Sequence, residues 1–284
     1  MPMIHTFGVI GGDERMRYLA DSIAADGYPV CTAGLEKLAP CRKAVPASME
    51  ELAKRSSVIV LPLPASRDGK TINAPYSEQE IAADDAFVRL LRNKIVYGGM
   101  IGKLVSTSDI WQEIGPEDYY RREALAVANA IPTAEGAIGV AVREYPGTVN
   151  GAKCLVTGFG RIGKNLAMLL KSMGADVSAA ARKQEDRMTM RAMGVRPLSF
   201  REITQRYDLI FNTVPAQVIG PPVLNRQDTE TWVIELASAP GGVDRMCAER
   251  CGVHVVDAPS LPGLVAPKTA AEDIKEAIYA MLEE

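Results

Sequence analysis

The sequence predicts an α/β protein of two Rossmann-like domains with parallel sheets, linked by helices around an interdomain cleft. Short apolar runs alternate with segments of helical periodicity along the chain, and a glycine-rich turn occupies residues 158–163. A chain of 284 residues also exceeds what one ordinary core requires. We expect a first domain at 1–130 and a second at 131–284, with a C-terminal helix, 268–284, that packs back on the first.

The composition is that of a soluble globular protein. Hydrophobic residues make up 47% of the chain and charged residues 24%, with a formal net charge of -3. This balance lacks the positive charge of a nucleic-acid binder, so we expect no nucleic-acid partner. No apolar run approaches the length that spans a bilayer, and the first residues carry no cationic leader. We therefore predict a cytoplasmic protein without a membrane contact.

The first domain begins with a strand, a glycine turn and a helix. Residues 6–10 are mainly apolar, Gly11 and Gly12 follow, and apolar residues then recur at helical spacing. Strands that alternate with helices favour a parallel sheet, so this domain is Rossmann-like or flavodoxin-like. Its other expected elements are strands at 28–32, 57–63 and 94–97 and a helix at 77–92.

The turn after the first strand is a candidate substrate-binding element. Gly12 precedes Asp13, the expected N-cap of the helix, and Arg15 lies on the first helical turn. Such a turn can hold a carboxylate or a phosphate at the helix N-terminus. Alternatively, the glycines only tighten the corner between strand and helix. A second nucleotide is less favoured, because the third glycine of a dinucleotide turn is missing.

The segment between the domains supplies candidate catalytic residues. We expect one helix at 119–130 and another that starts at Pro132, with Glu135 in its first turn. A helix that joins two such domains forms a wall of the cleft where ligands of α/β proteins bind. Glu135 could also be an acid favoured by the helix dipole, and Lys268 a solvated charge. The candidates are Asn129, Thr133, Glu135 and Lys268.

The second domain is organised around a dinucleotide-binding turn. The apolar run at 154–157 leads into the turn, and apolar residues then recur at helical spacing. Gly158 permits a tight turn, Gly160 lets the backbone approach a pyrophosphate, and Gly163 lets the helix pack close on the strand. The N-H groups at the helix start would bind the phosphates. The predicted pyrophosphate residues are Gly158, Gly160, Arg161, Ile162 and Gly163.

The end of the next strand indicates which dinucleotide binds. An NAD site carries an acidic residue there, which binds the ribose 2′-hydroxyl. In this chain the strand at 176–181 ends in Arg182 and Lys183. A carboxylate would repel a 2′-phosphate, whereas these cations would pair with it. The sequence therefore predicts NADP over NAD, unless the two cations are only a solvated basic pair.

The loops after the later strands are expected to line the rest of the cofactor site. Strands at 208–213, 231–236 and 253–256 each end in small residues or Pro and Gly. In a doubly wound sheet such loops gather over the cofactor. The residues predicted to line the ribose and the nicotinamide are Thr213, Val214, Pro215, Ala237 and Ser238.

Histidines and cysteines suggest no further chemistry. His5 precedes the first strand, and His254 alternates with core positions of a strand, so neither is expected to be a catalytic base. The five cysteines are scattered and odd in number, which favours free thiols. Cys247 and Cys251 could share a helix face, but neither histidine is near them in the sequence, and we predict no metal site.

Five stretches of the chain together resemble the A-subunit family of dipicolinate synthase. They are residues 131–137 (IPTAEGA), 156–163 (VTGFGRIG), 212–216 (NTVPA), 235–242 (ELASAPGG) and 261–269 (LPGLVAPKT). The resemblance covers nearly the whole chain, including the turn at 11–13 and the loop at 61–64, and is looser at 31–48. The glycine turn is shared with many dehydrogenases, whereas 129–137 and 261–270 are far more specific.

The resemblance implies a reaction and a partner. The cyclic product of aspartate semialdehyde and pyruvate, 4-hydroxy-tetrahydrodipicolinate, would be dehydrated, and dihydrodipicolinate oxidised to dipicolinate while electrons pass to NADP. It also implies a role in spore formation and a partner, a flavoprotein-like B subunit; we further expect a homo-oligomer. Aromatisation favours hydride departure, so a site without histidine suits this chemistry. The alternatives are a dehydrogenase of another small carboxylic acid and a non-catalytic NADP-binding subunit.

Overall fold

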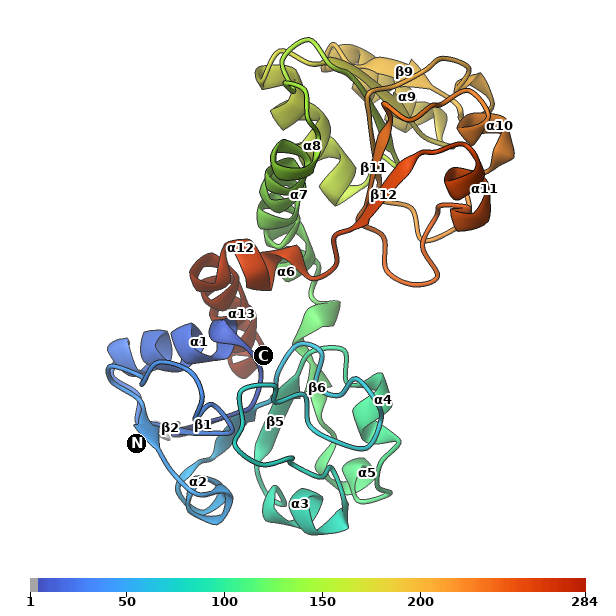
Figure 1. Ribbon diagram of the computed structural model, residues 1–284. Helices are drawn as coiled ribbons and strands as arrows, with labels where there is room; N and C mark the ends of the chain where they lie inside the picture. The colour runs from blue at the N-terminus through green and yellow to red at the C-terminus, as the bar shows by residue number, and fades with distance from the viewer. Residues whose placement is uncertain (1–4) are drawn as a thin grey trace. The chain divides into compact units, whose positions relative to one another are not determined.

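The computed structural model describes residues 5–284, which divide into two compact units. Unit 1 contains the chain up to Asn129 together with Ala266–Glu284, and unit 2 contains Ala130–Val265. Residues 1–4, on which the expectation of no leader partly rests, lie outside the described part. Each unit is an α/β layer structure with helices on both faces of a parallel sheet (Figure 1).

Unit 1 has the strand order β3-β2-β1-β4-β5-β6, with all pairs parallel. This is the Rossmann order, and it excludes the flavodoxin alternative. Its strands are β1 (Phe7–Ile10), β2 (Val30–Ala33), β3 (Val45–Pro46), β4 (Val58–Val60), β5 (Ile95–Gly98) and β6 (Glu117–Asp118). Its helices are α1 (Glu14–Ala25), α2 (Met49–Arg55), α3 (Asp85–Leu90), α4 (Gly102–Val105), α5 (Trp111–Ile114), η1 (Tyr119–Arg121), α6 (Glu123–Ala128) and α13 (Pro267–Leu282).

The central strands β1, β2 and β4 of unit 1 are buried on both faces because helices cover both sides. Phe7 and Val9 point into a core shared with α1 and α13, whereas Ile10 belongs to the core on the opposite face. The C-terminal helix α13 packs on α1. Lys275 Nζ lies 3.0 Å from an Asp26 carboxylate oxygen, which also accepts a 2.9 Å hydrogen bond from the Tyr279 hydroxyl. These contacts fix the chain's last helix to its first.

The helix expected at 77–92 is wrong over its first half. Only α3 is helical there, and the preceding segment pairs with the 70–72 loop: the Ile72 N-H donates to the Ile81 carbonyl at 2.9 Å, and the Ala83 N-H to the Lys70 carbonyl at 2.8 Å. The Asp84 side chain then accepts from the Phe87 N-H at 3.0 Å. This cap starts the helix eight residues later than the composition suggests.

Unit 2 has the strand order β12-β11-β10-β7-β8-β9, which again is the Rossmann order with parallel pairs throughout. Its strands are β7 (Lys153–Thr157), β8 (Asp176–Ala180), β9 (Arg196–Leu198), β10 (Leu209–Asn212), β11 (Trp232–Glu235) and β12 (His254–Asp257). Its helices are α7 (Ala130–Glu144), α8 (Arg161–Ser172), α9 (Gln184–Ala192), η2 (Phe200–Glu202), α10 (Pro221–Leu224), α11 (Arg245–Arg250) and α12 (Leu261–Val265).

The helices of the connecting segment differ from the expectation. Arg122 is extended, so the predicted helix at 119–130 is divided into the short helix η1 and the helix α6. The next helix, α7, begins at Ala130 and includes Pro132, whose missing N-H falls in the first turn, where no partner is needed. Glu135 therefore lies in the second turn of α7, exposed, and not in the first turn.

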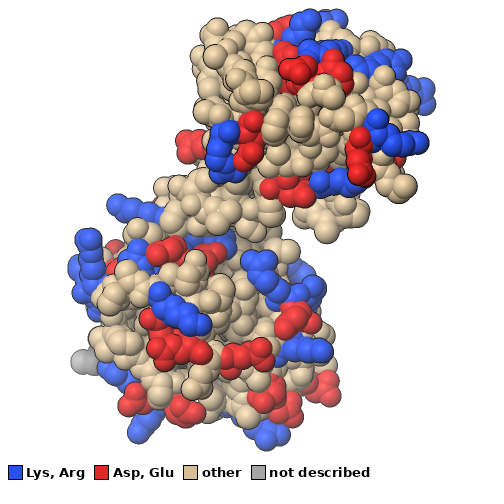
Figure 2. Space-filling model, in the orientation of Figure 1, with Lys and Arg blue, Asp and Glu red and all other residues tan. Residues whose placement is uncertain are grey.

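The expectation that no apolar run approaches membrane-spanning length is also wrong. Among the described residues, the segment Glu123–Glu144, which comprises α6, Asn129 and α7, is long and apolar enough by length and composition to cross a membrane, with a mean hydropathy of 1.5. Part of its apolar composition has another explanation, because Ala134, Ala137 and Ala141 are fully buried in the core of unit 2. Basic and acidic side chains are interspersed over both units on the face in Figure 2.

Candidate functional site

The turn between β7 and α8 has the geometry that each of its glycines predicts. Gly158 has φ +89°, and a Cβ there would collide with the Thr213 and Val214 side chains. A Cβ on Gly163 would collide with the Gly158 carbonyl oxygen, so α8 and β7 approach as closely as backbones can. Both positions accept only glycine, and they bring the turn against the loop that follows β10.

Gly160 is different, because none of the described residues occupies the space beside it. A Cβ built there meets no atom within 4 Å, and its φ of -79° is accessible to any residue. Gly160 is the N-cap of α8, and no side chain caps this helix. The backbone of the helix start is therefore accessible, with the positive end of the helix dipole behind it. This cradle fits a dinucleotide pyrophosphate.

A buried polar network joins the carboxyl ends of β7, β10 and β11. The Thr157 hydroxyl donates to Asn212 Oδ1 at 2.6 Å, and Asn212 Nδ2 donates to Glu235 Oε1 at 2.7 Å. Glu235 is only 4% exposed, yet its carboxylate accepts from the Ala237 N-H at 3.0 Å and the Gly242 N-H at 2.9 Å. The network therefore holds the loop after β11 against the end of β10.

The same network fixes the loop after β10. Asn212 Oδ1 also accepts from the Val214 N-H at 3.2 Å, and the Thr213 hydroxyl donates to the Thr157 carbonyl at 2.8 Å. The five residues predicted to line the ribose and nicotinamide lie in the two loops that Asn212 and Glu235 organise. The sequence reasoning assigned no role to Asn212 or Glu235, although polar residues ending apolar strands are a signal for such a role.

The end of β8 places Arg182 and Lys183 on the surface, with Lys183 as the N-cap of α9. Arg187, which the sequence reasoning did not single out, donates from Nη1 to the carbonyls of Ala181 at 3.1 Å and Arg182 at 2.8 Å. It holds the backbone of this corner and adds a third cation. Acidic residues follow in the first turn of α9, at Glu185 and Asp186.

The turn of unit 1 lies at the strand-order switch between β1 and β4, but its own side chains fill it. Arg15 is 6% exposed and forms two 2.8 Å hydrogen bonds to the Asp13 carboxylate and one of 2.7 Å to the Leu63 carbonyl. Burial alone would lower the pKa of Arg15, but the bond to Asp13 raises it above its usual value. A Cβ on Gly12 would collide with Met16. The charge of Arg15 is thus matched within the turn.

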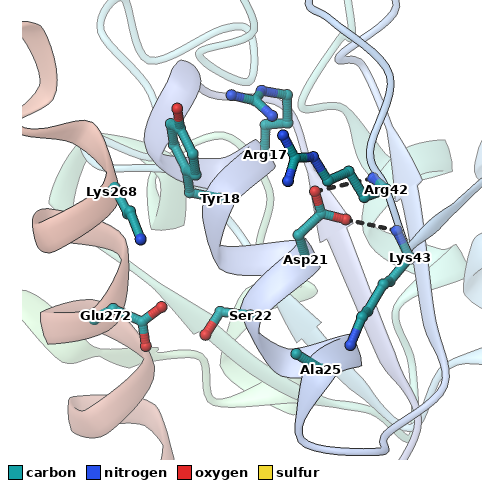
Figure 3. A pocket seen from close by; sticks show the side chains of 9 residues that line it. All are labelled: Arg17, Tyr18, Asp21, Ser22, Ala25, Arg42, Lys43, Lys268 and Glu272. Atoms are coloured by element: carbon teal, nitrogen blue, oxygen red, sulfur yellow. Dashed lines mark hydrogen bonds between the residues drawn. The ribbon is translucent and has the colours of Figure 1, made fainter.

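The four candidate catalytic residues belong to both units. Asn129 ends α6, and Lys268 lies exposed at the start of α13, both in unit 1. Thr133 is buried and Glu135 exposed, both on α7 in unit 2. Within unit 1, Lys268 lines a pocket with Tyr18 and Glu272 (Figure 3).

His254 and the cysteines, for which the sequence suggested no chemistry, were not among the predicted site residues. His254 is at the amino end of the edge strand β12, exposed, with its ring stacked on Trp232 at a centroid distance of 4.3 Å. It is therefore a surface residue and not part of the strand's buried pattern. The five cysteines are free thiols. The sulfurs of Cys247 and Cys251 both contact Asn225 Oδ1, at 3.7 and 3.6 Å.

Comparisons with known proteins agree with this arrangement. Residues 6–108 match the N-terminal domain of the dipicolinate synthase A subunit, and residues 133–231 match the NAD-binding domain of D-isomer specific 2-hydroxyacid dehydrogenases. The dipicolinate synthase A subunit of Bacillus subtilis is 27% identical over 97% of this chain and 95% of its own. The second domain therefore binds a nicotinamide dinucleotide, and the chain is related to oxidoreductases.

Two solved structures extend the similarity to the fold. The dipicolinate synthase A subunit from Bacillus halodurans superposes with a TM-score of 0.89 at 27% identity, covering 100% of this chain and 99% of that one. The A chain of dipicolinate synthase from Bacillus subtilis gives 0.86 at 26% identity, with coverage of 100% and 97%. The similarity thus includes both units and the C-terminal helix.

Replacing Gly160 by alanine should weaken dinucleotide binding without disturbing the fold. The added Cβ meets no protein atom but enters the space a pyrophosphate would use, so we expect a loss of about 1.5–3 kcal/mol, the contribution of a hydrogen bond to a charged group. Calorimetric titration with NADP measures the loss. The control is Gly139→Ala, an equally open helical glycine of the same unit. Unchanged affinity in folded Gly160→Ala protein would exclude this turn as the pyrophosphate site.

Replacing Glu235 by glutamine should destabilise unit 2 and weaken dinucleotide binding. In the wild-type protein both carboxylate oxygens of Glu235 accept hydrogen bonds from N-H groups. In the glutamine variant one of these oxygens becomes an NH2 group, which then faces another donor. The cost expected for one buried unsatisfied contact is about 1–3 kcal/mol of unfolding free energy. Denaturant unfolding and NADP titration measure the two effects. Glu230→Gln, the same change at an exposed position of the unit, is the control. If both variants behave alike, the network does not support the loops.

Proposed function

Since the chain carries the N-terminal domain of the dipicolinate synthase A-subunit family and resembles its members along its whole length, we propose that it oxidises dihydrodipicolinate to dipicolinate with NADP. The observation that supports an oxidation most directly is the open cradle at Gly160, within a domain of dehydrogenase type. The substrate is a small cyclic dicarboxylate. It would form from 4-hydroxy-tetrahydrodipicolinate by loss of water.

The reaction removes a hydride and a proton from the ring and leaves an aromatic pyridine. NADP, when bound, accepts the hydride. The gain of aromaticity favours this step, so the chain's residues need mainly to orient the ring and accept one proton. Gly158, Gly160 and Gly163 shape the pyrophosphate turn, with the N-H groups of Arg161 and Ile162 at the helix start. The loops fixed by Asn212 and Glu235 present Thr213, Val214, Pro215, Ala237 and Ser238 to the ribose and nicotinamide.

The remaining groups are assigned to the substrate. The carboxylate of Glu135 is exposed on α7 and is our choice for the proton acceptor, with Thr133 two residues before it on the same helix. Lys268 supplies a positive charge for a ring carboxylate, and Asn129 a polar side chain. At the turn of unit 1, Gly12, Asp13 and Arg15 would meet the substrate with groups that already have partners: the Gly12 N-H donates to the Asn73 carbonyl at 2.8 Å, and the Arg15 side chain pairs with Asp13 at 2.8 Å.

We propose NADP over NAD because of the cations at the end of β8. Arg182 is exposed there, and Arg187 anchors the backbone on which it stands. A planar guanidinium can bind a 2′-phosphate with two hydrogen bonds and stack on the adenine, while Lys183 adds a point charge. The acids Glu185 and Asp186 lie in the helical turn after this corner, where the dipole of α9 favours them.

The cellular setting follows from the same family. We propose a cytoplasmic protein of spore formation that forms a homo-oligomer and works with a flavoprotein-like B subunit. Two alternatives remain distinct from this proposal: a dehydrogenase of another small carboxylic acid, and a non-catalytic NADP-binding subunit whose partner holds the active site.

Turnover by the purified chain distinguishes these functions. The full chain with NADP and freshly generated substrate should produce dipicolinate and NADPH in equal amounts. Each product is measured by its own absorbance. Gly160→Ala protein should lose this activity in parallel with its cofactor affinity. Cofactor binding without turnover, restored only by the flavoprotein-like partner, would favour the non-catalytic alternative. Turnover of another small acid in place of dihydrodipicolinate would favour the other dehydrogenase.

Replacing Arg182 by alanine should reduce NADP affinity selectively. Loss of a charge-assisted contact to the 2′-phosphate corresponds to about 2 kcal/mol, while NAD, which lacks this phosphate, should bind almost unchanged. Both dissociation constants are measured at one ionic strength. Arg191→Ala, which removes an exposed arginine in the last turn of the same helix α9, is the control. Equal losses for the two cofactors would assign Arg182 to the adenine or to the fold.

A further inference from the structure

Unit 1 contains a pocket of about 510 Å³ that is separate from its glycine turn. The helix α1 forms its floor, α13 one side, and the loop before Ala44 the other (Figure 3). The volume is within the range that small-molecule sites occupy. Its charged lining residues are Arg17, Asp21, Arg42, Lys43, Lys268 and Glu272.

Basic side chains line the pocket from opposite sides. Lys268 extends from α13, whereas Arg42 and Lys43 lie on the loop across α1 (Figure 3). Within residues 5–284, none of these three side chains forms an ion pair, whereas Arg17 pairs with Glu14 at 2.7 Å. Three cations thus surround one cavity without a carboxylate bound to them.

The two acids of the pocket already have partners. The Asp21 carboxylate accepts from the backbone N-H groups of Arg42 at 3.0 Å, Lys43 at 2.9 Å and Ala44 at 3.3 Å. Burial would raise the pKa of Asp21, but these three donors lower it below its usual value. Glu272 lies 2.9 Å from Lys275 Nζ, which is not among the lining residues.

The role of Asp21 is therefore to shape the loop. Its bonds reach the backbone of residues 42–44 and leave the Arg42 and Lys43 side chains at the pocket. A loop held in this way presents two adjacent cations in a defined position.

Cations gathered around one cavity repel one another unless an anion lies between them.

We propose that this pocket binds a small organic dicarboxylate, with one carboxylate at Lys268 and the other at Arg42 and Lys43. Two charged groups, one at each end of the ligand, match cations on two opposite sides better than a single carboxylate would. Dipicolinate is a suitable probe, and picolinate, which lacks the second carboxylate, is its matched monoanion. The inference rests on the proposed function in its use of Lys268, but binding here does not require turnover, so the failure of the titration and the failure of the reaction are distinguishable.

The test is calorimetric titration of the full chain with both probes, without cofactor and at fixed ionic strength. Arg42→Ala with Lys43→Ala should weaken dipicolinate binding about tenfold and remove most of its advantage over picolinate, because the partners of the second carboxylate are lost. The backbone bonds to Asp21 survive these substitutions, so the loop should keep its place. Lys268 is left unchanged, because the proposed function already uses it.

Two control variants separate a specific effect at Arg42 and Lys43 from a general effect of charge. Lys54→Ala with Arg55→Ala removes an adjacent exposed pair of the same charge on α2 and should not alter dipicolinate binding. Arg42→Lys with Lys43→Arg keeps both charges and should preserve it. Unchanged dipicolinate affinity in the Arg42/Lys43 double alanine variant would overturn the proposal. Equal weakening in the Lys54/Arg55 variant would do the same, because it would show a general charge effect.

Discussion

A buried carboxylate organises the carboxyl edge of the second sheet, and no cation among residues 5–284 is bonded to it. Glu235 is 4% exposed, and its oxygens accept from Asn212 Nδ2 and from the N-H groups of Ala237 and Gly242. Because a buried charge is costly unless hydrogen bonds replace its hydration, the surrounding backbone must hold this geometry. The two loops that line the predicted cofactor site are consequently fixed to each other before any ligand arrives.

The two glycine turns show how one local pattern serves two different purposes. Both follow the first strand of a Rossmann sheet, and both precede a helix. In unit 1 the space beside Gly12 is filled, and the helix start is capped by Asp13. In unit 2 the space beside Gly160 is open, and no side chain caps α8. An uncapped helix start with an open approach favours an anion, whereas the capped one has satisfied its own donors.

The sequence was sufficient for features that depend on local chemistry. The apolar runs predicted the main strands of both sheets, because a parallel sheet covered on both faces requires them. The spacing of Gly158, Gly160 and Gly163 predicted a turn whose three positions have three different constraints. The sequence-based predictions were wrong where the local structure depends on pairing with another segment of the chain. Residues 77–83 looked helical, but pairing with the 70–72 loop competes with the helix. The short elements β3 and β6 likewise exist through pairing with a neighbouring strand.

Site residues were predictable where a local sequence pattern defines them, and not where their role depends on side-chain contacts that only the fold creates. Asn212 and Glu235 come together only because β10 and β11 are neighbours in register, with Asn212 opposite Glu235. Arg187 is five residues beyond Arg182, and only the turn into α9 directs its guanidinium back to the Arg182 carbonyl. The cofactor preference proposed for this corner would therefore depend on two arginines with separate tasks. Arg187 fixes the backbone, and this leaves the Arg182 side chain available for the ligand. A substitution at Arg187 would consequently act through the position of Arg182, whereas one at Arg182 removes the charge itself.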